Sequence, residues 1–250
     1  MQLDACLRSI ELYAPYAGAI TVIYTASTPV FDEGYRQLQR SERIRLVRES
    51  DFEADVHNEL AAAEERVVFH TDDDLFFRRP PAAPFVPDGY AAFSLRLGRN
   101  TTYCYPLDRP QPLPSFAIVD GVLGWDWRRA EHDFAYPLSV NGHIFRVQLL
   151  RRLLDGRRFR NPNELEHVLH QRRHLAPPGL LAFAQSSVVS IPANLVNVGF
   201  ANRAAHDGAL SADALNARFL AGERLDLDRI DFSGVSSTHC ELALAFARPT

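Results

Sequence analysis

The chain has 250 residues and a formal net charge of −4, and 46% of its residues are hydrophobic, so it can form a real core as one large α/β domain or two small ones. The acidic balance gives no basic footprint for nucleic acid or an anionic membrane surface. There is no membrane-length apolar run, no signal-peptide pattern and no metal-like or disulfide-like cysteine spacing, so we expect a protein of the reducing cytoplasm without a transmembrane segment.

The first third of the chain alternates between helix-like and strand-like segments. Apolar residues at helical spacing predict a helix over residues 2–14, which ends before Pro15. The next predicted elements are a strand at 19–24, a helix at 32–40, a strand at 44–47 and a helix that Asp51 caps. Such alternation predicts parallel strands joined by helical crossovers. We therefore expect a mixed but mostly parallel α/β sheet flanked by helices.

Three consecutive carboxylates, Asp72, Asp73 and Asp74, stand between two apolar segments. Residues 67–69 before them predict a buried strand, and the apolar run resumes at 75–77. Charges beside core segments need a cation or a solvated cleft, and open α/β sheets bind ligands at the carboxyl ends of their strands. Hard oxygen donors this close together suit Mg²⁺ or Mn²⁺ shared with a phosphate-bearing substrate. A solvated acidic turn is the alternative, but the flanking hydrophobicity favours a ligand site.

Proline-rich segments interrupt the regular pattern after the acids. Residues 80–87 and 106–114 predict loops, and residues 90–97 predict a strand between them. Both loops are short and flanked by core-like residues, so we expect them to belong to the same domain as the rest of the chain.

Aromatic and polar residues cluster near the middle of the chain. Trp125 and Trp127, the only tryptophans, lie close to several carboxylates, including Asp133. Aromatic rings beside carboxylates can hold a sugar, although an equally good alternative places both indoles in the core. Asn141 and the glycine after it predict a turn, which puts His143 at the start of a strand. Trp125, Trp127, Asn141 and His143 are therefore candidate acceptor-binding residues, with a structural role as the alternative for the histidine.

The last third begins with a helix predicted within residues 159–170. Asn161 or Asn163 can cap it, and Glu166 suits its positive N-terminus or, alternatively, acts as a general base. Further along, the pattern predicts a strand at 187–191, an apolar run at 195–200 and a helix at 211–221. His239 could reach back to a metal, although an isolated histidine is more often structural.

Several segments resemble the GT-A glycosyltransferases, which carry a DxD signature after a central strand. Asp72 and Asp74 match this signature within VVFHTDDDLFF. QLDACLRSIELYAP, FAYPLSVNGHIFR, FRNPNELE and LNARFLAGERLDLDRIDF are also similar to segments of family 2-like and uncharacterised bacterial glycosyltransferase-like proteins. The resemblance implies a single GT-A-like, Rossmann-like domain. Its residues 1–105 would form the nucleotide- and metal-binding half, and residues 106–250 the acceptor-binding half.

The resemblance also implies metal-dependent transfer of a sugar from a nucleotide sugar to an unknown acceptor, with Mn²⁺ or Mg²⁺ as cofactor. Asp74 would bind the cation that bridges the donor phosphates. Asp72 would bind the metal through water or hold the ribose, and Asp73 would contact the ribose or the sugar. A metal suits this step because the departing nucleoside diphosphate carries charge that a cation neutralises. On this view, Asp74→Ala would abolish donor binding and leave the fold intact.

Other roles are implied for residues of the acceptor half. Glu166 is the closest match to the family's carboxylate base, Asp133 is its rival, and His239 is a candidate further metal ligand. GT-A proteins usually have a strand before the helix at 2–14, and this sequence starts inside that helix, so we expect the sheet to lack that strand. Two other functions stay open: a metal-dependent phosphoester or diphosphate hydrolase, and a degenerate scaffold that binds a sugar or a protein partner.

Overall fold

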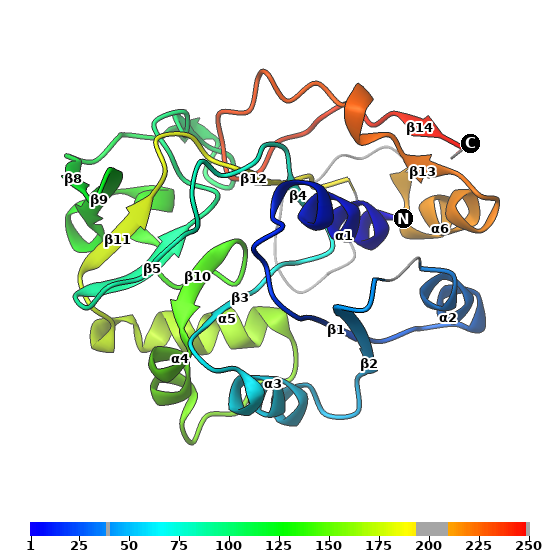
Figure 1. The fold of residues 1–250 in the computed structure, drawn as a ribbon, viewed down its shortest axis with the longest axis horizontal. Coiled ribbons are helices and arrows are strands. Elements are labelled where there is room, and N and C mark those ends of the chain that lie inside the picture. The colour runs from blue at the N-terminus through cyan, green and yellow to red at the C-terminus, as the bar shows by residue number, and fades with distance from the viewer. Residues whose placement is uncertain (39–40, 194–209, 249–250) are drawn as a thin grey trace.

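The structure, a computed structural model, describes residues 1–38, 41–193 and 210–248. Its largest sheet has six strands in the order β3-β10-β5-β11-β9-β8 (Figure 1). These strands are β3 (Arg66–Val68), β5 (Tyr90–Ser94), β8 (Ala117–Val119), β9 (Val122–Asp126), β10 (His143–Arg146) and β11 (Gly179–Ala182). Only β5 and β11 run parallel, whereas the other neighbouring pairs are antiparallel. The mixed α/β class is confirmed.

The prediction of a mostly parallel, Rossmann-like sheet is wrong. The helical crossover of α2 (Pro29–Arg36) does produce parallel pairing between β1 (Ile20–Tyr24) and β2 (Ile44–Arg48). These two strands form a separate sheet and do not join β3. Several later connections are loops or tight hairpins, such as the Asp120-Gly121 turn between β8 and β9, and a tight hairpin can join only antiparallel strands.

Three pairs of short strands complete the described sheets. They are β4 (Asp74–Phe76) with β12 (Val188–Ser190), β6 (Tyr103–Cys104) with β7 (Arg109–Pro110), and β13 (Arg224–Leu225) with β14 (Phe246–Ala247). The β4–β12 pair connects the acidic triplet to the chain just before residue 194. The predicted apolar run at 195–200 lies outside the described residues.

Helices lie around the sheets (Figure 1). Besides α2, the described α-helices are α1 (Gln2–Tyr13), α3 (Phe52–Ala62), α4 (Val147–Leu154), α5 (Pro162–Gln171) and α6 (Ala212–Leu220). Asp51, Asn161 and Ser211 cap α3, α5 and α6, each accepting a bond from the backbone N–H three residues later. α4 contacts α3, α5 and β10, whereas α1 contacts β4 and β13. No helix in the described ranges is long and apolar enough to span a membrane.

The main sheet is covered on both faces. Consecutive strand residues point to opposite faces, and buried residues of the same strand are divided between two clusters. Ala92 and Phe145 join the cluster that includes α4 and α5, whereas Phe93 and Ile144 join the cluster that includes α1 and β4. The apolar character of these strands is therefore continuous along the sequence.

Phe93→Ala should lower the free energy of unfolding by about 3–5 kcal/mol, since it leaves a cavity in a close-packed core. The Phe93 ring is fully buried and lies 4.7 Å from the ring of Phe183. Denaturant unfolding checks this value. Ile118→Ala is the control because Ile118 is 67% exposed, and its effect should stay within about 0.5 kcal/mol. Equal effects of the two substitutions would contradict the assignment of Phe93 to the core.

Candidate functional site

The acidic triplet lies where the chain passes from the main sheet into the β4–β12 pair. β3 is an edge strand in the described sheet, and Val68 is 37% exposed. The prediction of a buried strand before the acids is therefore wrong, because β3 pairs with β10 alone in the described sheet and its residues are exposed or partly exposed. A turn follows, in which the backbone N–H of Asp74 donates to the carbonyl of Thr71 at 3.1 Å. β4, which begins at Asp74, is buried throughout.

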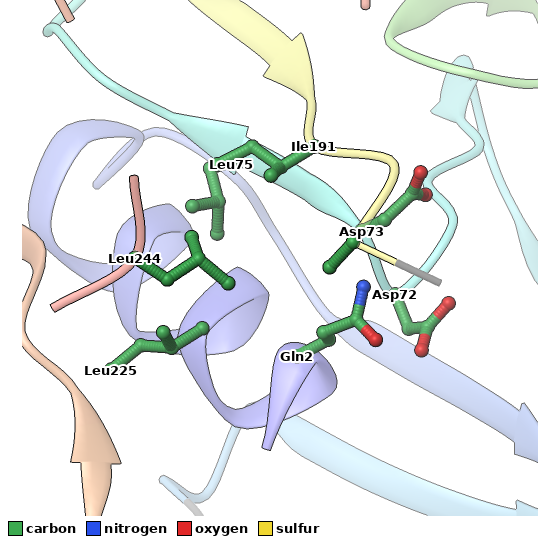
Figure 2. Close-up of a pocket in the computed structure, with 8 residues that line it drawn as sticks. Gln2, Asp72, Asp73, Leu75, Ile191, Leu225 and Leu244 are labelled. Carbon is green, nitrogen blue, oxygen red and sulfur yellow. The ribbon is translucent and has the colours of Figure 1, made fainter. Parts of the chain in front are cut away.

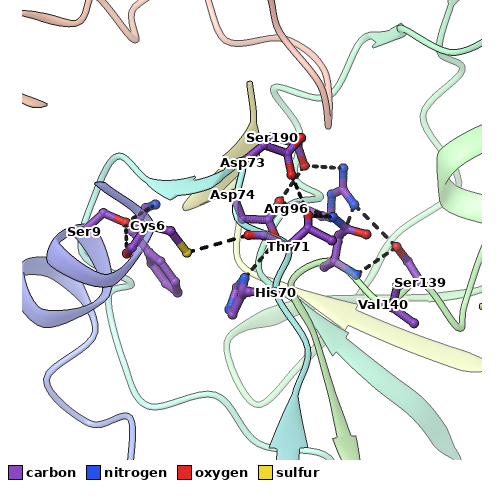
Figure 3. A network of polar contacts seen from close by, with 12 residues as sticks. Cys6, Ser9, His70, Thr71, Asp73, Asp74, Arg96, Ser139, Val140 and Ser190 are labelled. Carbon is purple, nitrogen blue, oxygen red and sulfur yellow. Dashed lines mark hydrogen bonds and ion pairs between the residues drawn. The ribbon is translucent and has the colours of Figure 1, made fainter. Parts of the chain in front are cut away.

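Asp74 is the anchor of the triplet and is fully buried (Figure 3). Its Oδ1 accepts hydrogen bonds from Ser190 Oγ at 2.5 Å and Asn141 Nδ2 at 3.4 Å, and its Oδ2 lies 3.0 Å from His70 Nδ1. Burial alone would raise the pKa of Asp74. The hydrogen bond and electrostatic interaction with His70, together with the charge of Arg96, outweigh burial and hold the pKa of Asp74 below its usual range. Asp74 is thus an ionised carboxylate whose two oxygens already have protein partners.

Asp72 and Asp73 have the opposite environment. Asp72 is exposed, Asp73 is half-buried, and both line a small hollow beside Gln2 of α1 (Figure 2). Thr71 Oγ1 donates to Asp73 Oδ1 at 2.6 Å. Burial, together with the negative charges of Asp74 and Asp72, raises the pKa of Asp73. The rest of the hollow is mostly apolar, and the carboxylate groups of Asp72 and Asp73 point away from it (Figure 2). Two carboxylates therefore retain some exposure beside the hollow, whereas the third is buried in the core.

A buried arginine completes the anchor. Arg96 is 4% exposed, and its Nη2 donates to Ser190 Oγ at 3.2 Å and to the carbonyl of Thr238 at 3.0 Å. The same nitrogen lies 3.4 Å from the imidazole nitrogens of His239. Among the described residues, its Nε has no hydrogen-bond partner. A buried guanidinium requires an opposite charge nearby, and the Asp74 carboxylate provides one.

The hydrogen bonds continue from Arg96 to Asp133. Thr238 Oγ1 donates to Asp133 Oδ2 at 3.2 Å, and Cys104 Sγ donates to Asp133 Oδ1 at 3.8 Å. Burial raises the pKa of Asp133. Burial and the charge of Arg96 lower the pKa of His239 to about 3, so its imidazole is neutral near pH 7. The structure thus brings Asp74, Asp133 and His239 into one polar network.

Glu166 takes part in a different set of contacts. Its Oε1 accepts a hydrogen bond from the backbone N–H of Val140 at 3.0 Å, and it also hydrogen-bonds with the Tyr136 side chain. Asn161 supplies the helix cap, so capping is not the role of Glu166. Glu166 supports the segment that precedes Asn141, and Asn141 itself contacts Asp74.

The two tryptophans are core residues. Trp125 and Trp127 are 5% and 7% exposed. Their indole nitrogens donate to the carbonyls of Phe134 at 2.9 Å and Pro177 at 2.8 Å. Of the two alternatives for these residues, this placement favours the structural one, since little of either ring remains for a ligand.

Sequence patterns could have identified some residues of this network but not others. Arg96 is the one charged residue in the predicted strand at 90–97, and a charge within an apolar run could have identified it. His70 lies within four residues of the acids. Ser190 and Thr238 carry no local sequence pattern, because only the β4–β12 pairing and the C-terminal segment bring them near Asp74.

The two accessible carboxylates beside the hollow suit a divalent cation. Among the described residues, no three His, Cys, Asp or Glu side chains are arranged to hold a metal. Asp72 and Asp73 are nevertheless hard oxygen donors that face solvent. Mg²⁺ and Mn²⁺ commonly bind one or two carboxylates and complete their coordination with water and substrate phosphates, so the residues present fit such an ion.

Comparison with protein-family models, characterised proteins and solved structures found no match for this chain. The resemblance to GT-A glycosyltransferases therefore stays a prediction from the sequence.

Asp74→Ala should lower the free energy of unfolding by about 1–3 kcal/mol, since it leaves the buried hydroxyl of Ser190 without its acceptor and removes one of the acids near Arg96. The expectation that this substitution leaves the fold intact is therefore revised. Denaturant unfolding measures the effect, and Asp72→Ala, at the exposed first acid, should change it by no more than about 0.5 kcal/mol. If Asp74→Ala unfolds at the wild-type denaturant concentration, Asp74 is not an anchor.

His143→Asn should weaken the acid sensitivity of the fold. Burial and the charge of Arg96 lower the pKa of His143 from 6.5 to about 3. Between these values the unfolded chain binds a proton that the folded chain does not, so stability falls on acidification by up to about 1.4 kcal/mol per pH unit. Free energies of unfolding measured from pH 7 to pH 4 should show a shallower slope for the variant. His174→Asn, at an exposed position, is the control, and an unchanged slope for His143→Asn would contradict the assignment.

Proposed function

We propose that this protein transfers a sugar from a nucleotide-sugar donor to an acceptor, in a reaction that needs Mn²⁺ or Mg²⁺. The observation that supports this proposal most is the division of roles within the acidic triplet. Asp74 is buried and held by protein partners, whereas Asp72 and Asp73 meet solvent beside a hollow. A cation shared between protein and a diphosphate needs one or two accessible carboxylates fixed to a rigid support.

In this proposal Asp72 and Asp73 hold the cation. When bound, the cation would supply positive charge to stabilise the departing nucleoside diphosphate. Asp74 has a supporting role. Its hydrogen bonds with Ser190 and His70 fix the start of β4 and therefore the backbone of the two acids before it. This assignment differs from the one implied by the family resemblance, in which Asp74 binds the metal directly.

Asp133 is the candidate general base of the acceptor half. Its carboxylate shares a polar network with Asp74 through Thr238, Arg96 and Ser190. Burial raises its pKa, which makes it a better proton acceptor than an ordinary aspartate whenever it is ionised. Its role would be to remove the proton of an acceptor hydroxyl as that oxygen attacks the sugar.

Thermal-shift titration of the wild-type protein with nucleoside diphosphates and sugar nucleotides, with and without Mn²⁺, tests the proposal. Binding to the folded state raises its stability by about 2.7 kcal/mol when the ligand is at 100 times its dissociation constant. We expect a metal-dependent rise in melting temperature with one class of nucleotide. Asp72→Asn and Asp73→Asn should lose the metal-dependent part, and the exposed, distant Asp155→Asn should keep it.

The other outcomes of this experiment distinguish the remaining functions. A well-folded protein with no shift across the panel would leave only a scaffold that binds neither metal nor nucleotide. A shift followed by release of free sugar, whichever acceptor is present, would identify a hydrolase that uses the same acids to activate water. Retention of the metal-dependent shift in Asp72→Asn and Asp73→Asn would contradict the assigned ligands.

A further inference from the structure

We infer that Glu166 is a positioning residue that orients Asp73 through the turn formed by residues 139–142, and is not the catalytic base. This inference rests on the proposed function, because it assigns Asp73 to the cation. Three hydrogen bonds and the chain between Val140 and Asn141 connect the two carboxylates. Their coupling is built in four steps.

The first step is a rigid support for Glu166. Asn161 caps α5 by accepting a hydrogen bond from the backbone of Glu164 at 2.9 Å. Leu165 and Leu169 on the same helix are buried at 2% and 0% exposure. The backbone on both sides of Glu166 is therefore fixed by a cap and by core packing, which restricts where its side chain can reach.

The second step joins α5 to the 139–142 turn. Glu166 Oε1 accepts the backbone N–H of Val140 at 3.0 Å. Just before the turn, the Tyr136 side chain hydrogen-bonds to Glu166, and its ring stacks on His170 of the same helix at 4.9 Å. α5 thus holds this part of the chain at more than one point, through a charged acceptor and an aromatic contact.

The third step places Asn141. Its backbone carbonyl accepts a hydrogen bond from Arg96 Nη1 at 3.4 Å, and the backbone N–H of Gly142 donates to the carbonyl of Phe69 at 2.8 Å. The turn is therefore fixed on the side of β3 as well as on the side of α5. Gly142 has a φ of +62°, which favours glycine at this position of the turn.

The fourth step reaches the acids. Asn141 Nδ2 donates to Thr71 Oγ1 at 2.5 Å, and Thr71 Oγ1 donates to Asp73 Oδ1 at 2.6 Å (Figure 3). The donor order is consistent throughout, since the threonine hydroxyl accepts from the amide and gives its own proton to the carboxylate. Displacing the turn would change the hydrogen bond that sets the Asp73 carboxylate.

The chemistry of Glu166 favours support over proton transfer. One of its oxygens accepts a backbone N–H, and the side chain also bonds a tyrosine hydroxyl, so its hydrogen-bonding capacity serves the turn. An uncharged glutamine has the same shape and can replace both contacts, because its amide oxygen accepts from Val140 and its amide nitrogen can donate to Tyr136. Glu166→Gln and Glu166→Ala therefore separate positioning from catalysis.

The test measures Mn²⁺ affinity in the presence of a nucleoside diphosphate, using the electron paramagnetic resonance signal of free Mn²⁺. Loss of a residue that orients a metal ligand typically weakens metal binding by about 10–100-fold, so we expect at least a tenfold loss for Glu166→Ala. Glu166→Gln should bind Mn²⁺ nearly as well as the wild type and should retain any turnover. Glu164→Gln, on the same helix and paired with Arg160, is the matched control.

A second variant keeps the test decisive if Glu166→Ala folds poorly. Asn141→Ala removes the next link in the relay and should cause a similar loss of Mn²⁺ affinity. In a well-folded double variant the two losses should not multiply, because residues in one network couple. Multiplying losses, or wild-type Mn²⁺ affinity in either single variant, would overturn the inference. If Glu166→Gln keeps Mn²⁺ affinity and loses all turnover, Glu166 is the base and the inference is also overturned.

These outcomes are separate from failure of the proposed function. If the wild type binds no Mn²⁺ with any nucleoside diphosphate, the proposed function fails, and the inference fails with it. If the wild type binds Mn²⁺ and Glu166→Ala binds it equally well, only the inference fails.

Discussion

The structure depends on a pair of opposite charges taken out of water together. Asp74 and Arg96 are both buried, and the charge of Arg96 is one of the causes that favour the ionised form of Asp74. Ser190 is bonded to both side chains, which fixes their relative positions. Asp74 and Arg96 form no direct ion pair, so the hydroxyl of Ser190 between them, together with the surrounding polar atoms, sets the geometry that two buried charges require. This constraint ties β4 and β12 to the C-terminal segment that carries Thr238 and His239.

The same pair explains why three identical residues in a row behave differently. Asp74 has a cation, an imidazole and a hydroxyl beside it, so the balance favours its charged form. For Asp73, burial and the negative charges of Asp74 and Asp72 outweigh the Thr71 hydroxyl and the charge of Arg96, so its pKa is raised. A divalent cation bound near the Asp73 carboxylate would lower the pKa of Asp73, because its positive charge favours the ionised form. Of these two acids, only Asp73 has a raised pKa that an added positive charge would lower.

Local structure could be read from the sequence, and long-range pairing could not. The Asp51 cap, the first helix and the parallel β1–β2 pair follow from short-range patterns, and the structure confirms them. The mostly parallel main sheet was wrong because the partner of each strand is chosen by segments far away in the chain. β5, for example, pairs with β10 and β11, and nothing in residues 90–94 indicates either. Sequence patterns also could not decide whether the tryptophans were core or platform, since burial depends on neighbours that local patterns do not identify.

At the candidate site, too, local sequence patterns do not identify the long-range contacts of single side chains. The sequence identifies the acids, but the family resemblance assigns the metal to Asp74, which is fully buried. The polar residues that decide otherwise, Ser190, Arg96 and His70, come from three different parts of the chain. Accessibility and existing hydrogen bonds are the quantities that separate a ligand from its support, because an oxygen already satisfied by protein partners must lose them before it can bind a cation. By this criterion Asp72 and Asp73 are better candidates for cation ligands than Asp74, which is buried and bonded to protein partners.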